Sequence, residues 1–199
     1  MRKILETGYY CLLNIKLSCT YIKLLSCNHM KLLRKVIHPS LGSDYGSVFI
    51  RNTARAVVLK GEQVLLLYTA RYDDYSLPGG GVDKGESIEQ GLLRELHEET
   101  GAQQIQIKQS LGLYEEIRPW YKDDFDCVHI KSYCYFCEIS DEFADPKMEH
   151  YEVQNGMQPK WVNIFDAIAH NETTMAMSEK QGLSIQRETF LLKLIADTL

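Results

Sequence analysis

The chain has 199 residues, of which 45% are hydrophobic and 25% are charged. This composition is typical of a soluble globular protein, and the length suits one domain with a substantial core and room for a terminal appendage. The net charge of −5 gives no overall electrostatic basis for binding nucleic acid, so we expect no nucleic-acid partner. The six cysteines form no disulfide framework of a small secreted domain and follow no secretory signal, which favours a reducing, cytoplasmic environment.

The N-terminal stretch differs in charge from the rest of the chain. Residues 1–35 contain seven lysines and arginines against one glutamate, a net charge of +6 that leaves −11 for the remainder. No apolar run there reaches the roughly eighteen residues of a spanning helix, so we expect no transmembrane segment. Three interpretations stay open: a basic amphipathic segment on a membrane or partner, an extra element packed on the domain, or a translated leader upstream of a start at Met30.

A turn-rich linker follows this basic stretch. Pro39 and the glycine, serine and aspartate residues after it disfavour regular structure. We therefore divide the chain into residues 1–47, an N-terminal extension or leader with its linker, and residues 48–199, the folded domain.

Several strands are expected within this domain. The aliphatic runs over 48–60 and 63–69 predict two strands joined as a hairpin by the tight turn at 60–62. Apolar and polar residues alternate over 105–117 and again over 125–139, and a short last strand is expected over 161–164. Cys134 and Cys137 have redox or zinc spacing, but strand residues three apart face opposite ways, which predicts buried cysteines. One or two helical turns over 165–170 and a core-facing helix from Gly182 onward complete the domain.

The most informative stretch is a glycine-rich loop followed by a helix. Pro78 and the run Gly79, Gly80 and Gly81 predict a loop whose backbone can lie close to a ligand. Ser87 is a suitable N-cap, apolar residues then recur every four positions, and Gly101 suits the C-terminal end of the helix.

Three carboxylates share one side of this predicted helix. Glu95, Glu98 and Glu99 project from one arc next to the apolar stripe, and Arg94 is the nearest cation. Like charges placed so close repel each other, which indicates that a further positive charge neutralises them. Clustered carboxylate oxygens suit Mg²⁺ or Mn²⁺, and these ions in turn bind phosphates.

The stretch 80–102 resembles the Nudix box, G-x5-E-x7-R-E-U-x-E-E-x-G-U, in which U is an aliphatic residue. Its specified positions are filled by Gly80, Glu86, Arg94, Glu95, Leu96, Glu98, Glu99, Gly101 and Ala102. A chance match in a chain of this length is on the order of 10⁻⁷. The resemblance implies an α/β fold, an α/β/α sandwich around a mixed β-sheet. It also implies an Mg²⁺-dependent hydrolase that cleaves the pyrophosphate linkage of a nucleoside diphosphate joined to another moiety, such as a nucleotide sugar, an ADP-ribose-like compound or another nucleotide.

The resemblance also assigns roles to residues. The implied metal ligands are Glu95, Glu98, Glu99 and the backbone carbonyl of Gly80, and Glu86 would either brace the loop against the helix or ligate the metal through a water. Arg94 would orient the carboxylates through charge-assisted hydrogen bonds. The family takes its general base either from the box, where Glu95 is the candidate, or from a later loop, where Glu149 and Glu152 are the candidates. We accordingly expect Glu98→Gln to abolish turnover.

Two loop arginines are candidates for contact with the substrate, together with Gly79, Gly80 and Gly81. Arg71 follows the second strand in a polar, aromatic approach to the glycine loop. Arg118 precedes Pro119, Trp120 and Tyr121, a set equipped to stack a base and contact a phosphate, although an aromatic hairpin tip packed on its own strands is an equal alternative.

A second class of function stays open from sequence alone. The rival to a small-molecule hydrolase is a Nudix-like module that senses a nucleotide metabolite without cleaving it. A prenyl diphosphate isomerase also resembles the fold, but the required cysteine and glutamate contexts are not found here. A homodimer is left open.

Overall fold

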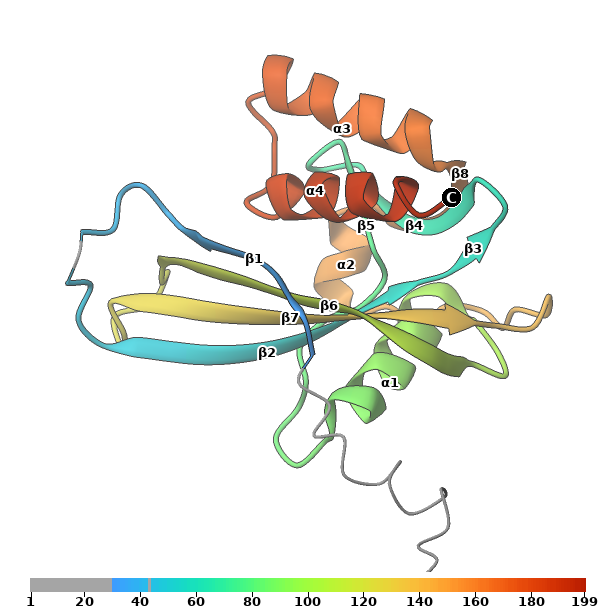
Figure 1. Ribbon diagram of the computed structural model, residues 1–199, viewed down its shortest axis with the longest axis horizontal. Helices are drawn as coiled ribbons and strands as arrows, with labels where there is room; N and C mark the ends of the chain where they lie inside the picture. Colours follow the sequence, from blue (N-terminus) through green and yellow to red (C-terminus); the bar gives the residue numbers. More distant parts are fainter. Residues whose placement is uncertain (1–29, 43) are drawn as a thin grey trace, which may run out of the picture.

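The computed structural model describes residues 30–42 and 44–199, so the expectations about residues 1–29 lie outside the described part of the chain (Figure 1). The strands are β1 (Leu32–Ile37), β2 (Val48–Val57), β3 (Leu59–Lys60), β4 (Gln63–Thr69), β5 (Asp74–Ser76), β6 (Gln106–Pro119), β7 (Cys127–Glu138) and β8 (Met157–Asn163). The helices are α1 (Ile88–Thr100), α2 (His150–Gln154), α3 (Ile164–Met177) and α4 (Ile185–Ala196). Among the described helices, none is both long and apolar enough to cross a bilayer.

The first sheet is mixed and has the strand order β1-β6-β7-β2. Strand β2 runs parallel to β7 from Val48 opposite Cys127 to Val57 opposite Phe136, while β6 and β7 form a long antiparallel pair. Strand β1 pairs in parallel with β6. The division expected at residue 47 therefore falls between two strands of one sheet.

The second sheet contains β3, β4 and β5 in that order, with β8 on the other edge of β4. Only part of the expected hairpin is present. Leu59 and Lys60 turn back onto Val64 and Gln63, whereas β2 pairs with β7 in the other sheet. The prediction of one hairpin over 48–69 was wrong for this reason, because a continuous apolar run cannot reveal that its two halves enter different sheets.

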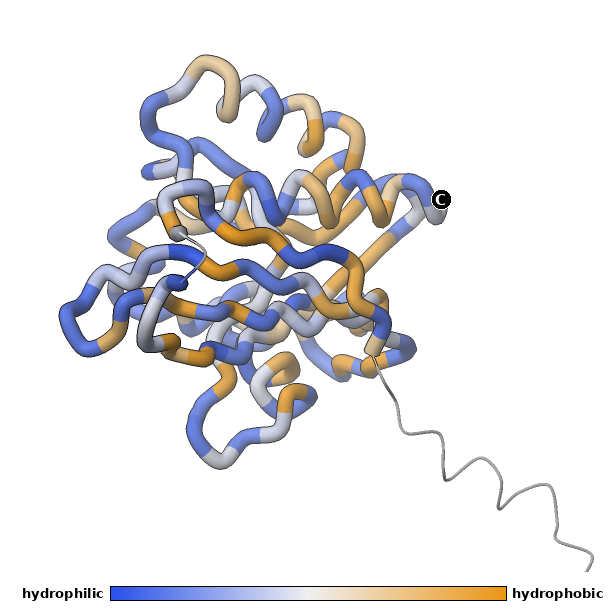
Figure 2. Tube along the Cα trace, turned by 60° about the vertical axis from the view of Figure 1, so that its left-hand side comes forward, coloured by the Kyte–Doolittle hydropathy of each residue, from blue (hydrophilic) through white to orange (hydrophobic). Residues whose placement is uncertain are grey.

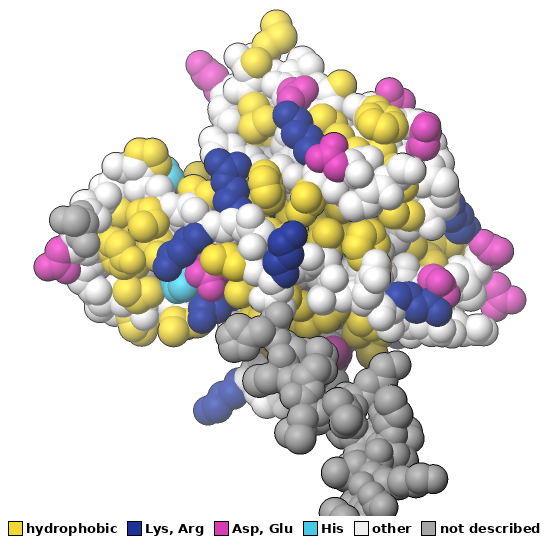
Figure 3. Space-filling model, in the orientation of Figure 1, with side chains coloured by type: hydrophobic (Ala, Val, Ile, Leu, Met, Phe, Trp, Pro, Cys, Tyr) yellow, Lys and Arg dark blue, Asp and Glu magenta, His cyan; other side chains and the backbone are white. Residues whose placement is uncertain are grey.

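Helices cover the sheets on both sides. On one side α1 packs on β2, where Leu92 and Leu96 meet Ala54 and Ala56, all fully buried. On the other side α3 and α4 contribute Ile164, Leu191, Leu192 and Ile195 to a second core cluster. Hydrophobic residues lie along the strands where these layers meet (Figure 2), and charged side chains of both signs are spread over the outer face of α3 and α4 (Figure 3). The expected α/β/α sandwich is confirmed.

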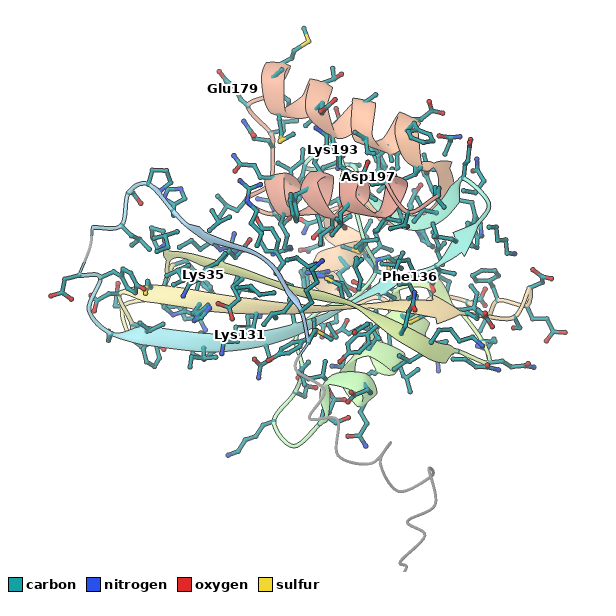
Figure 4. The ribbon with its side chains drawn as sticks, viewed as in Figure 1. Lys35, Lys131, Phe136, Glu179, Lys193 and Asp197 are labelled. Atoms are coloured by element: carbon teal, nitrogen blue, oxygen red, sulfur yellow. The ribbon has the colours of Figure 1, made fainter. Side chains whose placement is uncertain are left out.

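The C-terminal helices are packed together and joined by a surface ion pair. Helix α3 is longer than the one or two turns expected, and in α4 Lys193 points toward α3, where its Nζ lies 2.5 Å from Glu172 Oε1 (Figure 4). The short helix α2 was not predicted, because five residues are too few to show a helical period. In β7, Cys134 and Cys137 are buried free thiols that belong to opposite core clusters, as expected.

Helix α1 has the boundaries that its sequence predicts. Ser87 caps the N-terminus by accepting a hydrogen bond from the Gln90 amide, and the Gln90 side chain accepts from the Ser87 amide in return. Gly101 ends the helix in the left-handed conformation with φ 75°. Full burial of the Leu92 and Leu96 side chains stabilises the fold by about 2–3 kcal/mol each. Both leucines pack against Ala54 and Ala56 of β2, whose small side chains let α1 lie close to the sheet.

Candidate active site

Three carboxylates meet between α1, the glycine loop and α2. Glu95, Glu99 and Glu152 each place an oxygen within 4.8 Å of the other two, and Glu99 and Glu152 are buried. Glu95 and Glu99 are one helical turn apart and face the loop, while Glu152 comes from α2 some fifty residues later. We name these three residues the carboxylate cluster.

The glycine loop makes room for this cluster. A Cβ at Gly80 would lie 2.6 Å from the Glu95 carboxylate, so a larger residue there would displace that side chain. Gly79 has φ +131°, a region open to glycine, and its amide donates a 2.5 Å hydrogen bond to Glu99 Oε2. The Gly80 carbonyl accepts from the Ala54 amide at 3.0 Å, which leaves one lone pair free.

Burial sets the electrostatics of the cluster. Desolvation raises the pKa of Glu99 well above its usual range, against the opposing effects of Arg55 and of the Gly79 amide. Desolvation also raises the pKa of Glu95, although Arg94 acts in the opposite direction. The fold thus holds carboxylates close together at a cost that a bound cation would remove.

Arg94 organises a second set of carboxylates on the outer side of α1. Its Nε and Nη2 donate to Glu86 at 2.8 and 3.0 Å, and its Nη1 donates to Glu95 Oε1 at 2.9 Å and to Glu98 Oε2 at 3.2 Å. Its Nη2 also donates to the Gly81 carbonyl at 3.0 Å. These bonds hold the pKa of Glu86 down at about 2. Glu86 therefore fastens the loop to the helix, and neither Glu86 nor Glu98 belongs to the carboxylate cluster.

Glu152 is held in place by its own helix. Glu152 Oε2 accepts from the Glu149 amide at 2.7 Å, and Oε1 accepts from the Tyr151 hydroxyl at 3.0 Å. Burial and the adjacent Glu152 raise the pKa of Tyr151, so its hydroxyl keeps the proton that it donates. Glu149 is exposed and only begins the helix, so of the two loop glutamates the fold brings Glu152 to the site.

A cavity of about 380 Å³ opens over the carboxylate cluster, and arginines line it. Arg55 donates to the carbonyl oxygens of Leu77 and Gly79, and its Nε has no hydrogen-bond partner within residues 30–42 and 44–199. Arg118 reaches the same cavity from β6 with a buried Nη1 that is also without a partner in that part of the chain. Guanidinium groups that line a cavity are suited to bind an anion with several oxygens.

The other sequence candidates lie at the edge of this cavity. Arg71 is exposed and is not among the lining residues, although its Nη1 donates to Oδ1 of the lining residue Asn155 at 3.0 Å. Gly79, Gly80 and Gly81 all line the cavity.

Sequence reasoning missed the arginines of β2 and a buried ion network beneath the site. Arg51 and Arg55 stand four apart in a strand, on one face, and two charges at an even spacing are a signal that the sequence does carry. In α4, Arg187 bonds Glu188 and, at 3.1 Å, Glu116 of β6, while Glu188 accepts from the Leu77 amide at the start of the glycine loop. Adjacent opposite charges in a helix give no such signal, because they are normally solvated.

The chain is similar in sequence to several known proteins. The chain is similar to an RNA pyrophosphohydrolase of Ruthia magnifica subsp. Calyptogena magnifica, with 37% identity over 35% of this chain and 37% of that protein. It is also similar to the nucleoside triphosphatase NudI of Salmonella paratyphi B, with 42% identity over 30% of this chain and 35% of that protein. The matches thus span little more than a third of the length of these relatives. A solved NUDIX hydrolase from Nitrosomonas europaea covers 76% of this chain and 96% of its own at 19% identity and a TM-score of 0.49.

The family assignment comes from the domain as a whole. The model of the NUDIX domain matches residues 50–181, which include the glycine loop, α1, α2 and the arginines of β2. The match covers well over half of the chain, and the chain therefore belongs to the NUDIX domain family.

Proposed function

We propose that this protein hydrolyses a diphosphate linkage in a nucleotide and that a divalent cation, Mg²⁺ or Mn²⁺, is its cofactor. The observation that carries the proposal is the carboxylate cluster, whose three oxygens lie within 4.8 Å of one another beneath a cavity lined by arginines with unpaired nitrogen atoms. Acidic groups at the base and basic groups on the walls suit a ligand that combines a cation with a phosphate chain.

The side chains present fit such a cation. Glu95, Glu99 and Glu152 offer hard oxygen ligands, and the backbone carbonyl of Gly80 belongs to the loop that packs against Glu95. A bound divalent cation would offset the charge of the diphosphate and lower the pKa of a coordinated water. Arg94 keeps Glu95 in place, and the Gly79 amide does the same for Glu99.

The remaining roles follow from which atoms are free. Arg55 and Arg118 line the cavity and would hold the phosphate oxygens through their guanidinium groups. Both oxygens of Glu152 already accept hydrogen bonds, whereas Glu95 Oε2 has no partner in the described chain. Glu95 Oε2 is therefore our candidate for the atom that takes the proton of the attacking water.

The experiment is an activity screen with a matched pair of variants. Purified protein is incubated with Mg²⁺ and nucleoside diphosphate sugars, ADP-ribose and nucleoside triphosphates, and released products are separated by chromatography. Turnover of at least one compound, lost in Glu99→Gln and on chelation, supports the proposal. Tight binding of a nucleotide without turnover of any compound would favour a metabolite sensor instead.

A further inference from the structure

A row of buried charges connects helix α4 to the cavity over the carboxylate cluster. Arg187 and Glu188 are neighbours in α4, Glu116 comes from β6, and all three are buried. Helix α4 lies against β5, the strand that leads into the glycine loop (Figure 1). We call Glu116, Arg187 and Glu188 the buried network.

One end of the buried network holds the glycine loop. Glu188 Oε2 accepts a hydrogen bond from the Leu77 amide at 3.0 Å, and Glu188 Oε1 accepts from Arg187 Nε at 3.0 Å and from Arg187 Nη2 at 2.8 Å. Leu77 comes two residues before Gly79, whose amide bonds to Glu99 of the carboxylate cluster. The position of Leu77 therefore determines how the loop approaches that cluster.

The other end of the buried network holds an arginine of the cavity. Arg187 Nη1 donates to Glu116 Oε1 at 3.1 Å, and the same oxygen lies 3.7 Å from Arg118 Nε. Glu116 and Arg118 are two residues apart in β6, so their side chains share one face of the strand. Arg118 lines the cavity. Negative and positive side chains thus alternate from the glycine loop to the cavity wall.

Stability alone does not account for the buried network. Charged groups lose hydration when they are buried, and well-packed apolar residues of similar size often stabilise a core as well or better. Apolar side chains, however, cannot accept the hydrogen bond of the Leu77 amide or hold a guanidinium group in one orientation. What the charges supply here is a defined position for the loop and for Arg118.

We propose that Glu116, Arg187 and Glu188 are positioning residues that fix the glycine loop and Arg118 relative to each other. Both oxygens of Glu188 and every guanidinium nitrogen of Arg187 are engaged in the bonds described, so these residues act through the loop and through Arg118. Arg187 and Glu188 follow the residues 50–181 that the family model matches. The inference rests on the proposed function and adds to it a support from the C-terminal helix.

The first test follows hydrogen exchange of single amides by NMR and needs no substrate. Glu188→Met removes the acceptor of the Leu77 amide, and a hydrogen bond to a charged group is worth about 10- to 100-fold in an equilibrium, so exchange of this amide should rise by about that factor. The reference is the Leu65 amide, which bonds to the Val58 carbonyl in the core and should not change.

The coupling is tested from the far end of the buried network. Glu116 reaches the Leu77 amide only through Arg187 and Glu188, so faster exchange at Leu77 in Glu116→Gln, with Leu65 unchanged, is the expected result. Exchange at Leu77 that equals the wild-type rate in Glu116→Gln would overturn the proposal.

The second test separates kcat from KM with a substrate that the wild type hydrolyses. Glu188→Gln keeps an oxygen for the Leu77 amide but loses the charge that holds Arg187, so kcat should fall about tenfold with little change in KM. Glu116→Gln removes the anion beside Arg118, so KM should rise about tenfold with little change in kcat. Wild-type kcat and KM in both variants, whatever their melting temperatures, would make the buried network purely structural.

A third variant removes all the charges of the buried network at once. Glu116→Met, Arg187→Met and Glu188→Met together keep the approximate length of the side chains and leave none of these charges buried without its partner, so we expect the fold to survive. In this folded variant kcat/KM should fall about 100-fold. Wild-type kcat/KM in a folded triple variant would contradict the proposal.

Thr189→Ala is the matched control in α4. Thr189 is buried next to Glu188, and its hydroxyl donates to the Ile185 carbonyl of the same helix at 2.8 Å. The substitution weakens the helix without touching the buried network, so it should lower the melting temperature and leave kcat, KM and the exchange of Leu77 relative to Leu65 unchanged.

The two proposals can fail separately. If the wild type hydrolyses no nucleotide, the proposed function fails, and exchange at Leu77 in Glu116→Gln still decides whether the buried network is coupled to the loop. Hydrolysis by the wild type together with unchanged exchange at Leu77 would keep the function and remove the positioning role.

Discussion

The two sets of glutamates around α1 lie a few ångströms apart and differ in what neutralises them. Glu86 and Glu98 bond to Arg94 on the outer side of the helix. Glu99 and Glu152 are buried on the inner side without an arginine bond, and Glu95 belongs to both sets, since Arg94 holds only its Oε1. The pKa values follow this division: that of Glu86 is lowered to about 2, and that of Glu99 is raised.

This difference separates residues that shape the site from residues that act in it. A carboxylate with an arginine is already neutralised and has little to gain from a cation. A desolvated carboxylate that has no bonded arginine is stabilised most by a bound cation. We therefore expect the inner set to bind the metal and the outer set to position the loop and helix.

The largest effect should come from Glu99→Gln. The substitution keeps the size of the side chain and removes the charge, so we expect kcat/KM to fall about 10³-fold or more, since metal-assisted charge stabilisation is worth several kcal/mol. Steady-state kinetics with a substrate from the screen measures this loss.

Glu98→Gln is the matched control on the same helix. Its side chain is about one-third exposed and, among the described residues, bonds only to Arg94, so a loss of about tenfold is expected. This revises the expectation from sequence alone, in which Glu98→Gln abolishes turnover. Equal losses in the two variants would remove the distinction between the sets.

An intermediate effect is expected for Arg94→Lys. Lysine keeps the charge but cannot bond Glu86, Glu95, Glu98 and the Gly81 carbonyl together, so the loop and Glu95 lose their common support. We predict that kcat/KM falls about 10- to 100-fold. Circular dichroism should show an unchanged helix content, and a near-normal rate would mean that the outer set does not position the inner one.

The sequence predicted the local elements of this arrangement better than the contacts between distant segments. The boundaries of α1 follow from local signals, namely the Ser87 cap, the leucine stripe and Gly101, and local signals survive folding. The loop and the carboxylates of the helix were identified for the same reason.

The rest depends on contacts between distant segments. Which helical carboxylates face inward depends on α1 packing against Ala54 and Ala56, and the position of Glu152 depends on a helix of five residues. The arginines that line the cavity come from two strands, β2 and β6. Glu188, which supports the glycine loop, comes from α4 near the C-terminal end of the domain. No periodicity within one segment encodes such pairings.

The smallest effect is expected at Asp74, a buried carboxyl that lines the same cavity and, like the inner set, has no bonded arginine among the described residues. Desolvation, with Glu188 as a further cause, raises its pKa from 3.8 to about 6. The folded state thus binds this proton more tightly than the unfolded state, and the free energy of unfolding falls as pH rises from about 4 to about 6. Asp74→Asn should therefore stabilise the protein by about 1–2 kcal/mol at pH 8 and leave it unchanged below pH 4. Urea denaturation at the two pH values checks this, and an equal change at both would assign the effect to packing.

The most direct test of the central claim is the binding of Mn²⁺ measured by calorimetry in wild type, Glu99→Gln and Glu98→Gln. The inner set is predicted to hold the cation, so Glu99→Gln should weaken binding at least about 100-fold, whereas Glu98→Gln should weaken it about tenfold or less. Unchanged affinity in Glu99→Gln, or a greater loss in Glu98→Gln, would contradict the assignment of the carboxylate cluster as the metal site.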